Sequence, residues 1–320
     1  MAVNVVRFRQ QDTVRWGVVH SQGIRPIDGE YPTTRDFMLE GAARARGAGM
    51  DAGATLAFAD VDILCPVTPD RQFLCQAVNY RSHMRESGMD AASSPFNILF
   101  RKASSCLAPA DTDIVCPAHV EFLDYEVELG LVFSTDVSGP QQVTAGNLGR
   151  YVGGLVLLDD VSARDVQLPE MQFYKGKSYR TFGPAGPWLT LVEQADLDRF
   201  DLLHLRLSVN GQVRQDSYAS EMVHRPPATL TELSAVQDWQ AGDLLATGTP
   251  GGCALQAPAA PIRLLAQILS PIRRQSLLRK AAAANPRRLR PDDRIEASIR
   301  TDDGVIDLGV QRNRVVGGKP

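Results

Sequence analysis

Between about residue 67 and residue 256, short apolar runs alternate with Gly, Pro, Asn and Asp, and long helical periodicity is scarce. Examples are YVGGLVLLDDV, LRLSVNGQVRQDS and DLLATGTPGG. Short apolar runs bounded by such residues are typical of strands. Asn210-Gly211 lies between two alternating runs and predicts a tight hairpin, because both residues tolerate positive φ. The sequence therefore predicts a β-rich fold with few, short helices.

The two ends of the chain differ from this middle part. Residues 1–66 contain the alternating runs VVRFR and VRWGVVH, which predict a small N-terminal β-rich domain. The two prolines of VDILCPVTPDRQFLC indicate a linker into a main domain over residues 67–320. Within it, residues 258–290 form a basic insertion with apolar residues at helical spacing, interrupted by Pro271. This insertion carries eight basic residues and no acidic one.

The composition excludes several classes of protein. A formal net charge of −3 gives no electrostatic case for binding nucleic acid or an anionic membrane. The N-terminus lacks the apolar segment of a secretion signal, and no run approaches the roughly 20 apolar residues of a membrane helix. The five cysteines are scattered without a C-x-x-C pair, which favours free thiols in a reducing cytoplasm. We therefore expect a cytoplasmic protein with neither a nucleic acid nor a membrane as its partner.

The stretch LDYEVELGLVF, residues 123–133, predicts a buried strand that carries two carboxylates. Because successive side chains of a strand alternate between its faces, Glu126 and Glu128 project to the same side. Two like charges held roughly 6–7 Å apart repel each other, so without a cation one of them should take up a proton. A hard ion such as Mg²⁺, Mn²⁺ or Ca²⁺ would remove the conflict. The alternative is an edge strand whose polar face is exposed to solvent.

A second acidic feature ends the apolar run of GGLVLLDDVSARDVQ at Asp159-Asp160. Acids at the end of a buried strand are well placed to complete a metal site. The following residues, from Ser162 on, predict a short helical turn that brings Arg164 and Gln167 to the side of Asp160. A carboxylate, a guanidinium and an amide there would bind an organic anion beside a metal. The alternatives are a local salt bridge from Arg164 to its neighbouring aspartate, Asp165, and a helix-capping role for Asp159.

Together these stretches resemble the fumarylacetoacetate hydrolase family. The matching segments cover roughly residues 70–256 and the C-terminal strand, in the family's order: VNYRSHMRESG, ILFRKASSCL, DYEVELGLV, LDDVSARDVQ, KGKSYRTFGPAGPWL, VNGQVRQDS, LLATGTPGG and RNRVV. Each segment is a weak signal, and the set is highly specific. The resemblance implies an α+β fold, a mixed and mainly β roll with few short helices, and a homodimer.

The resemblance also implies a site for one Mg²⁺ or Mn²⁺, held by Glu126, Glu128 and Asp160. Three carboxylates leave open positions for water and for a chelating 2-oxo acid. By the same resemblance, Lys177 in KGKSYRTF is a buried cation that would stabilise enolate or carbonyl charge. Thr249 in TGTPGG matches a threonine that contacts substrate. The alternative for Thr249 is that it only shapes the glycine-rich turn.

His83 and Glu86, in NYRSHMRES, match the acid–base pair that some family members carry on a short mobile helix. At positions i and i+3 they share a helix face. Glu86 would orient the imidazole and raise its basicity, and His83 would then deprotonate a water molecule. The alternative is an exposed polar loop.

The sequence departs from the family pattern in three places. Asp159 stands where relatives have asparagine, Ala103 stands where they have proline, and the basic insertion of residues 258–290 follows the TGTPGG turn. Because an isolated amphipathic helix is marginal in water, the apolar face of the insertion must be covered by the protein body, a dimer partner or a membrane surface. A membrane would require a longer continuous apolar face than Pro271 allows, which favours the first two. We expect the insertion to pack over or beside the mouth of the active site and to limit which acyl groups enter.

The resemblance and the residues predict an acylpyruvate hydrolase-like enzyme of aromatic-compound catabolism. Its metal-dependent reaction would cleave a carbon–carbon bond in an acylpyruvate or related diketo acid, such as fumarylpyruvate, maleylpyruvate or fumarylacetoacetate. The same metal site also serves oxaloacetate-type decarboxylation, hydroxymuconate-type isomerisation and hydration–dehydration. His83 favours hydrolysis or decarboxylation. A non-catalytic binding protein would have lost these residues, and net acidity and Pro271 argue against a protein that uses the basic insertion to associate with a surface.

Overall fold

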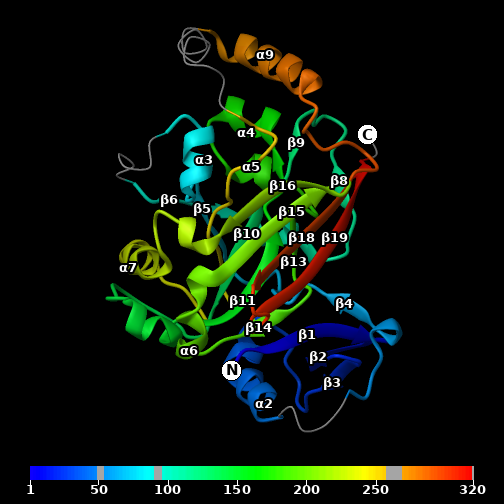
Figure 1. The fold of residues 1–320 in the computed structure, drawn as a ribbon, viewed down its shortest axis with the longest axis vertical. Coiled ribbons are helices and arrows are strands. Elements are labelled where there is room, and N and C mark those ends of the chain that lie inside the picture. Colours follow the sequence, from blue (N-terminus) through cyan, green and yellow to red (C-terminus); the bar gives the residue numbers. More distant parts are fainter. Residues whose placement is uncertain (49–53, 90–95, 257–268, 319–320) are drawn as a thin grey trace.

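The chain folds mainly into strands, described in a computed structural model for residues 1–48, 54–89, 96–256 and 269–318 (Figure 1). The strands are β1 (Val3–Gln10), β2 (Thr13–His20), β3 (Gly23–Pro26), β4 (Asp62–Leu64), β5 (Phe73–Ala77), β6 (Ile98–Lys102), β7 (Leu107–Pro109), β8 (Ile114–Cys116), β9 (Leu123–Asp124), β10 (Val127–Phe133), β11 (Val152–Asp159), β12 (Ser162–Ala163), β13 (Gly183–Ala185), β14 (Leu189–Leu191), β15 (Leu203–Val209), β16 (Gln212–Tyr218), β17 (Leu244–Ala246), β18 (Arg294–Thr301) and β19 (Asp307–Gly317).

Two main sheets organise these strands. The larger has twelve strands in the order β3-β2-β1-β14-β11-β10-β17-β5-β6, with β4, β7 and β13 paired off this path. The smaller has five strands in the order β16-β15-β18-β19-β8, and β9 pairs with β12 by itself. Most pairs are antiparallel, whereas β17 runs parallel to β5, β13 runs parallel to β7, and β19 runs parallel to β8. The fold is therefore mixed and mainly β, which confirms the predicted class.

The helices of the described residues are short. They are α1 (Thr34–Asp36), α2 (Ala42–Gly47), α3 (Arg81–Glu86), α4 (Arg164–Glu170), α5 (Tyr174–Lys177), α6 (Gln194–Leu197), α7 (Pro226–Val236) and α9 (Pro271–Ala284), with a π-helical segment at Phe37–Gly41 and 3₁₀ turns at Phe58–Asp60, Ser104–Cys106, Ala145–Arg150, Phe200–Leu202 and Ala219–Glu221. None of these described helices combines the length and apolarity that a bilayer crossing requires. All five cysteines are free thiols, as the sequence predicts.

The predicted hairpin at Asn210-Gly211 is confirmed. The two residues join β15 to β16 with φ angles of 52° and 77°, and Val209 pairs with Gln212 across the turn. Most residues with a β-carbon are strained at positive φ. Gly has no β-carbon, and Asn tolerates this conformation better than most residues. The local sequence therefore determines this turn.

The centre of the large sheet is the pair β10 and β11, in which every residue is buried. β10 lies between β11 and β17, so the wet-edge alternative for this strand is wrong. The predicted strand over residues 123–133 is interrupted at Tyr125 and Glu126. There the N–H of Glu126 donates to Asp159 Oδ1 at 2.7 Å, and the N–H of Val127 donates to Gln215 Oε1 at 2.9 Å. Side chains have replaced a neighbouring strand as the hydrogen-bond acceptors.

The segment after Asp160 also differs from the prediction. Ser162 and Ala163 form β12, which pairs with β9, and the helix α4 begins only at Arg164. The N–H of Arg164 donates to the carbonyl of Phe122 at 2.8 Å. This pairing holds the first residues extended and delays the helix by two positions.

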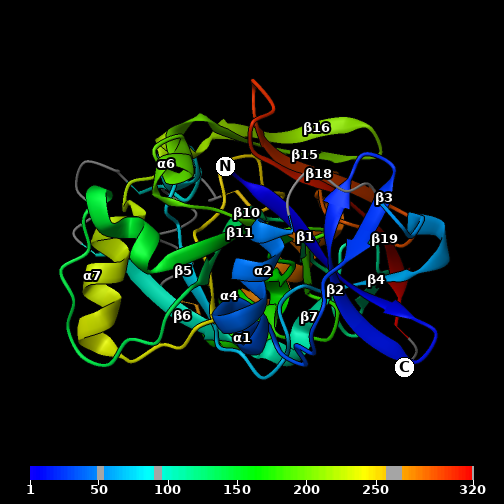
Figure 2. The same ribbon diagram turned by 90° about the horizontal axis from the view of Figure 1, so that it is seen from below.

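The N-terminal strands are continuous with the large sheet. β1 pairs antiparallel with β14, with Val3 opposite Leu191. Trp16 stacks on Phe37 with ring centroids 3.9 Å apart, and both side chains belong to the same hydrophobic core as the central strands of the large sheet. Figure 2 views the molecule from this end, with β1, β2 and α2 toward the reader. A separate domain over residues 1–66 stays a proposal.

The basic insertion contains α9, which starts at Pro271. Proline suits the first position of a helix because that position needs no N–H donor. Residues 257–268, which include the first part of the predicted insertion, lie outside the described residues. α9 packs against α4, and Arg279 Nη1 lies 3.8 Å from Glu121 Oε1 (Figure 1).

We predict that Gly130→Ala destabilises the protein by about 1–3 kcal/mol, the usual range for overpacking a core. A β-carbon at Gly130 in β10 would lie 2.6 Å from Val156 Cγ1 and 2.9 Å from Leu244 Cδ1. Gly146→Ala is the matched control, because a β-carbon there would meet nothing within 4 Å. Urea unfolding of both variants is the measurement, and equal midpoints would contradict the packing described for β10.

Candidate functional site

The carboxylates of Glu126, Glu128 and Asp160 meet where β10 begins and β11 ends. One ligand oxygen from each lies within 4.8 Å of the other two. All three are buried, with exposed fractions of 5%, 1% and 1%. The N–H of Asp160 donates to the carbonyl of Glu126 at 2.8 Å, so the antiparallel pairing of the two strands fixes the approach. The structure thus brings together the three residues predicted as metal ligands.

Lys177 places a buried positive charge against this group. From α5, its Nζ donates to Glu126 Oε2 at 2.6 Å, to Asp160 Oδ2 at 2.5 Å and to Ser162 Oγ at 2.9 Å. Burial alone would lower the pKa of Lys177, but the carboxylates of Asp160 and Glu126 outweigh it and raise that pKa above its ordinary value. Lys177 therefore stays protonated.

Arg164 and Gln167 converge on the site from α4, as their spacing predicts. Arg164 Nη1 donates to Gln167 Oε1 at 2.9 Å, and its Nε donates to Asp124 Oδ2 at 2.9 Å. Its third nitrogen, Nη2, donates to Glu126 Oε1. Asp165 accepts backbone N–H groups of the segment before β9, so the local Arg164–Asp165 pair is not formed. The guanidinium is thus directed toward the carboxylate cluster.

Glu128 lacks a cationic hydrogen-bond partner among the described residues. Its Oε2 accepts the N–H of Gly248 at 2.9 Å, on a turn where φ is +88° and glycine is favoured. Burial, together with the charges of Asp160 and Glu126, raises the pKa of Glu128 well above its ordinary value. Burial acts the same way on Glu126, but its neighbouring cations, Arg164 first, lower its pKa below the ordinary value. The pKa shifts of the two glutamates therefore run in opposite directions, and in the absence of a cation a shared proton is favoured on Glu128.

Asp159 is a second buried acid without charge compensation. Its Oδ1 accepts the N–H of Glu126, and its Oδ2 is buried with no partner in the described part of the chain. Burial raises the pKa of Asp159 to about 7. As the last residue of β11 it caps no helix, so that alternative is wrong.

Lys102 belongs to the site, although the sequence reasoning did not single it out. Its Nζ donates to Asp160 Oδ1 at 2.5 Å and to the carbonyl of Phe182 at 2.7 Å. It is the last residue of β6, two positions after Phe100 and hence on the same face. The sequence signal for a buried Lys102 was its position on the same strand face as the apolar Phe100.

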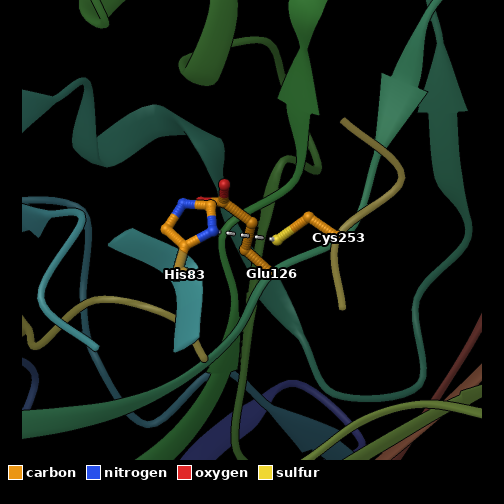
Figure 3. A group of neighbouring side chains, drawn as sticks. All are labelled: His83, Glu126 and Cys253. Atoms are coloured by element: carbon orange, nitrogen blue, oxygen red, sulfur yellow. Dashed lines mark hydrogen bonds between the residues drawn. The ribbon is translucent and has the colours of Figure 1, made fainter. Parts of the chain in front are cut away.

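His83 is buried on α3, with an exposed fraction of 7%, so the exposed-loop alternative is wrong. Burial lowers the pKa of His83, against the opposing effect of Glu126, and a neutral imidazole can accept a proton. Its Nδ1 lies 3.9 Å from Cys253 Sγ (Figure 3). Glu86 is placed differently from the expectation, because its Oε2 accepts the N–H of Gly252 at 2.8 Å. The described hydrogen bonds include none between Glu86 and His83.

Thr249 both stabilises the glycine-rich turn and lines the cavity. Its hydroxyl donates to the carbonyl of Val127 at 2.9 Å and accepts from Gln215 Nε2 at 2.8 Å, which fixes the turn after β17. It also lines the cavity described next. Its one proton is used by the fold, so toward a ligand it offers an oxygen.

All the predicted site residues except Glu86 line a cavity of about 150 Å³. Its polar end holds the three carboxylates, His83 and Lys177, and its apolar wall consists of Phe100, Phe173, Leu168, Leu255 and Val78. The rings of Phe100 and Phe173 lie 4.7 Å apart. Leu168 belongs to α4, against which α9 packs, so α9 lies next to one of the helices that line the cavity.

The chain belongs to the fumarylacetoacetate hydrolase family. The family described as "Fumarylacetoacetate (FAA) hydrolase C-terminal" matches residues 72–316, and the family described as "Rv2993c-like, N-terminal" matches residues 5–66. Protein Rv2993c of Mycobacterium tuberculosis is 34% identical over 230 residues, which is 71% of this chain and 83% of that protein. A Burkholderia ambifaria protein, provisionally named a hydrolase, is 31% identical over 268 residues, which is 82% of this chain and 92% of that protein.

Solved structures share the fold. Fumarylacetoacetate hydrolase of Exiguobacterium antarcticum is 29% identical, with a TM-score of 0.68 over 99% of this chain and all of that chain. Maleylpyruvate hydrolase of Sphingobium, solved with manganese(II) and pyruvate, is 24% identical, with a TM-score of 0.69 and coverage of 99% and 100%. A 5-carboxymethyl-2-hydroxymuconate delta-isomerase of Mycobacterium smegmatis is 23% identical, with a TM-score of 0.69 and coverage of 98% and 100%. The implied fold type is thus confirmed.

We predict that Asp159→Asn stabilises the metal-free protein increasingly as pH rises from about 4 to about 7. The folded protein keeps the Asp159 proton up to pH about 7, whereas the unfolded chain loses it near the ordinary value of 3.8. Folding stability therefore falls with rising pH across this window and is constant above it. Asparagine carries no such charge, so its advantage grows to at most about 4 kcal/mol.

Urea unfolding in EDTA at pH 5 and pH 8 measures this difference. The exposed Asp12 provides the control as Asp12→Asn, which should shift stability little at either pH. A gain for Asp159→Asn that is equal at both pH values would contradict a buried acid titrating between them.

Proposed function

We propose that the protein is a divalent-metal-dependent hydrolase that cleaves a carbon–carbon bond in an acylpyruvate or related diketo acid. The observation that carries the proposal is the meeting of three buried carboxylates and a buried, neutral His83 in one cavity. The Sphingobium maleylpyruvate hydrolase, solved with manganese(II) and pyruvate, shares this fold. A 2-oxo acid and a hard divalent cation are therefore the first ligands to test.

The residues present fit a hard cation. Glu126, Glu128 and Asp160 offer only oxygen ligands, which suit Mg²⁺ or Mn²⁺. Lys177 compensates two of these carboxylates, whereas Glu128 meets only a backbone N–H, so positive charge is still needed there. When bound, Mg²⁺ or Mn²⁺ would supply Lewis acidity toward the carboxylate and 2-oxo groups of the substrate.

In the proposed reaction, His83 takes a proton from a water molecule, whose oxygen bonds to the distal carbonyl carbon. The bond between this carbon and the adjacent methylene breaks, and its electron pair becomes a pyruvate enolate. The ammonium of Lys177 supports the enolate charge. The proton held by His83 returns to the enolate carbon, so one water is consumed and a carboxylic acid and pyruvate are formed.

The remaining residues would orient the substrate. Arg164 supplies positive charge at the anionic end, and Gln167 and Thr249 present polar atoms to the cavity. The pair Phe100 and Phe173 suits an acyl group that is flat or apolar. Selection of the acyl group by the basic insertion stays a prediction, supported by the packing of α9 on α4. A homodimer and a role in aromatic catabolism belong to this proposal through the family resemblance, and a cytoplasmic location belongs to it through the scattered cysteines.

Hydroxymuconate-type isomerisation is the second candidate. It is favoured by the placement of Glu86, whose Oε2 accepts the N–H of Gly252, so Glu86 does not orient the His83 imidazole as the hydrolase prediction requires. A hydrolase depends on that imidazole to activate water, whereas an isomerase moves a proton within its substrate.

A screen of the purified protein tests the proposal. We expect pyruvate release from acylpyruvates with Mg²⁺ or Mn²⁺, none in EDTA, and loss of this release in a folded Glu128→Ala variant. Glu232→Ala, on the exposed face of α7, is the matched control. Oxaloacetate and hydroxymuconate-type dienes in the same screen separate decarboxylase and isomerase activity. Full turnover in EDTA would refute the metal-dependent mechanism.

We predict that His83→Ala lowers kcat by roughly 10²–10⁴, the usual range for a general base, while Mn²⁺ affinity stays unchanged. The affinity is measured by calorimetry and kcat by pyruvate release at saturating metal. His119→Ala, which removes an exposed imidazole, is the control. Hydrolysis near the wild-type rate would remove His83 from the mechanism and favour the isomerase.

A further inference from the structure

A second group of metal-ligand side chains lies beside the carboxylate cluster. The ligand atoms of His83, Glu126 and Cys253 are all within 4.8 Å of one another, and all three residues are buried. Figure 3 shows the imidazole and the thiol facing each other, with Glu126 beside them. His83 comes from α3, Glu126 precedes β10, and Cys253 ends the turn after β17. Among the described residues, Cys253 is the only cysteine in such a group.

The donor set distinguishes this group from the carboxylate cluster. Sulfur and imidazole ligands select Zn²⁺ and similar cations, whereas oxygen-only sites suit Mg²⁺ and Mn²⁺. Tetrahedral Zn²⁺ with ordinary bond lengths places its sulfur and nitrogen ligands about 3.6 Å apart. Cys253 Sγ and His83 Nδ1 are 3.9 Å apart, so a shift of a few tenths of an ångström suffices.

Hydrogen bonds on both sides of the pair hold these two residues together. Ser82 Oγ accepts the N–H of Gly251 at 2.9 Å, and Glu86 Oε2 accepts the N–H of Gly252 at 2.8 Å. These bonds tie α3 to the turn that carries Cys253. Gln215 Nε2 lies 3.6 Å from Cys253 Sγ as a donor, a contact that a thiolate strengthens. The arrangement is the kind of outer support that orients metal ligands.

We propose that Cys253, His83 and Glu126 form a second metal site, for a thiophilic cation such as Zn²⁺, which inhibits the enzyme by occupying His83. On binding, the S–H bond is replaced by a sulfur–metal bond, the proton passes to water, and no electrons are exchanged. The inhibition rests on the proposed function, in which His83 is the base, whereas the binding does not. Because Glu126 belongs to both groups, occupation of this site also draws a ligand away from the hard cation.

Cadmium binding tests the site independently of activity. One equivalent of Cd²⁺ is added to the full chain in excess Mg²⁺, and the ultraviolet thiolate-to-metal absorption is recorded. We expect a signal of one thiolate in the wild type and in Cys116→Ser, whose thiol is the most accessible of the five, and none in Cys253→Ser. No signal in the wild type, or a signal retained in Cys253→Ser, would overturn the site. Cys253→Ala, checked by circular dichroism, replaces the serine variant if that variant does not fold.

The second part of the proposal, inhibition through His83, is tested by titrating the enzyme with Zn²⁺ in saturating Mg²⁺. Cys253→Ser should need at least about tenfold more Zn²⁺ than the wild type for half-inhibition, a typical effect of altering a metal site's ligand shell. A cadmium signal that depends on Cys253, without Zn²⁺ inhibition of measurable turnover, would overturn the inhibitory role. An intact signal with no turnover on any substrate would instead refute the proposed function and leave only the binding site.

Discussion

Acids buried together must receive either positive charge or protons, and this requirement organises the middle of the molecule. Three buried carboxylates form ion pairs with three buried cations: Asp124 with Arg164, Glu126 with Arg164 and Lys177, and Asp160 with Lys102 and Lys177. Glu128 and Asp159 are left without a cation, and the pKa of each is raised. These two acids must therefore be neutralised either by protons or by additional positive charge. A divalent cation bound there would compete with protons, so its affinity would rise with pH.

Glu126 is the residue on which the two groups of ligands depend. It interrupts the strand that its sequence predicts, because its N–H bonds to the Asp159 side chain, and the break directs its carboxylate between Arg164 and Lys177. From that position it also lies within reach of His83 and Cys253. The carboxylate of Glu126 thus belongs both to a ligand group with oxygen atoms only and to a ligand group that contains sulfur. The two groups of ligands therefore share the negative charge of Glu126.

The sequence predicts the parts of this site that local periodicity encodes. The strand alternation around Glu128, the apolar run before Asp160 and the helical spacing of Arg164 and Gln167 are all short-range patterns, and the structure has each of them. The partners that were missed are distant in sequence: Lys102 meets Asp160 across 58 positions, and His83 meets Cys253 across 170. The break at Glu126 and the late start of α4 likewise follow from contacts with other segments. The pairing of β1 with β14 has the same origin, since an alternating run does not specify its neighbour.

The position of β17 has a consequence for the order in which the protein assembles on the ribosome. β17 lies between β10 and β5 in the large sheet, yet it is synthesised after both. Until residues 244–246 emerge, the two earlier strands cannot be joined in the sheet, and the backbone N–H and C=O groups of β10 that pair with β17 form an open edge. Exposed strand edges of this kind favour pairing with other chains during synthesis. The glycine-rich turn that completes the site follows β17 directly. The same short segment therefore joins the two parts of the sheet and completes the burial of the charged side chains.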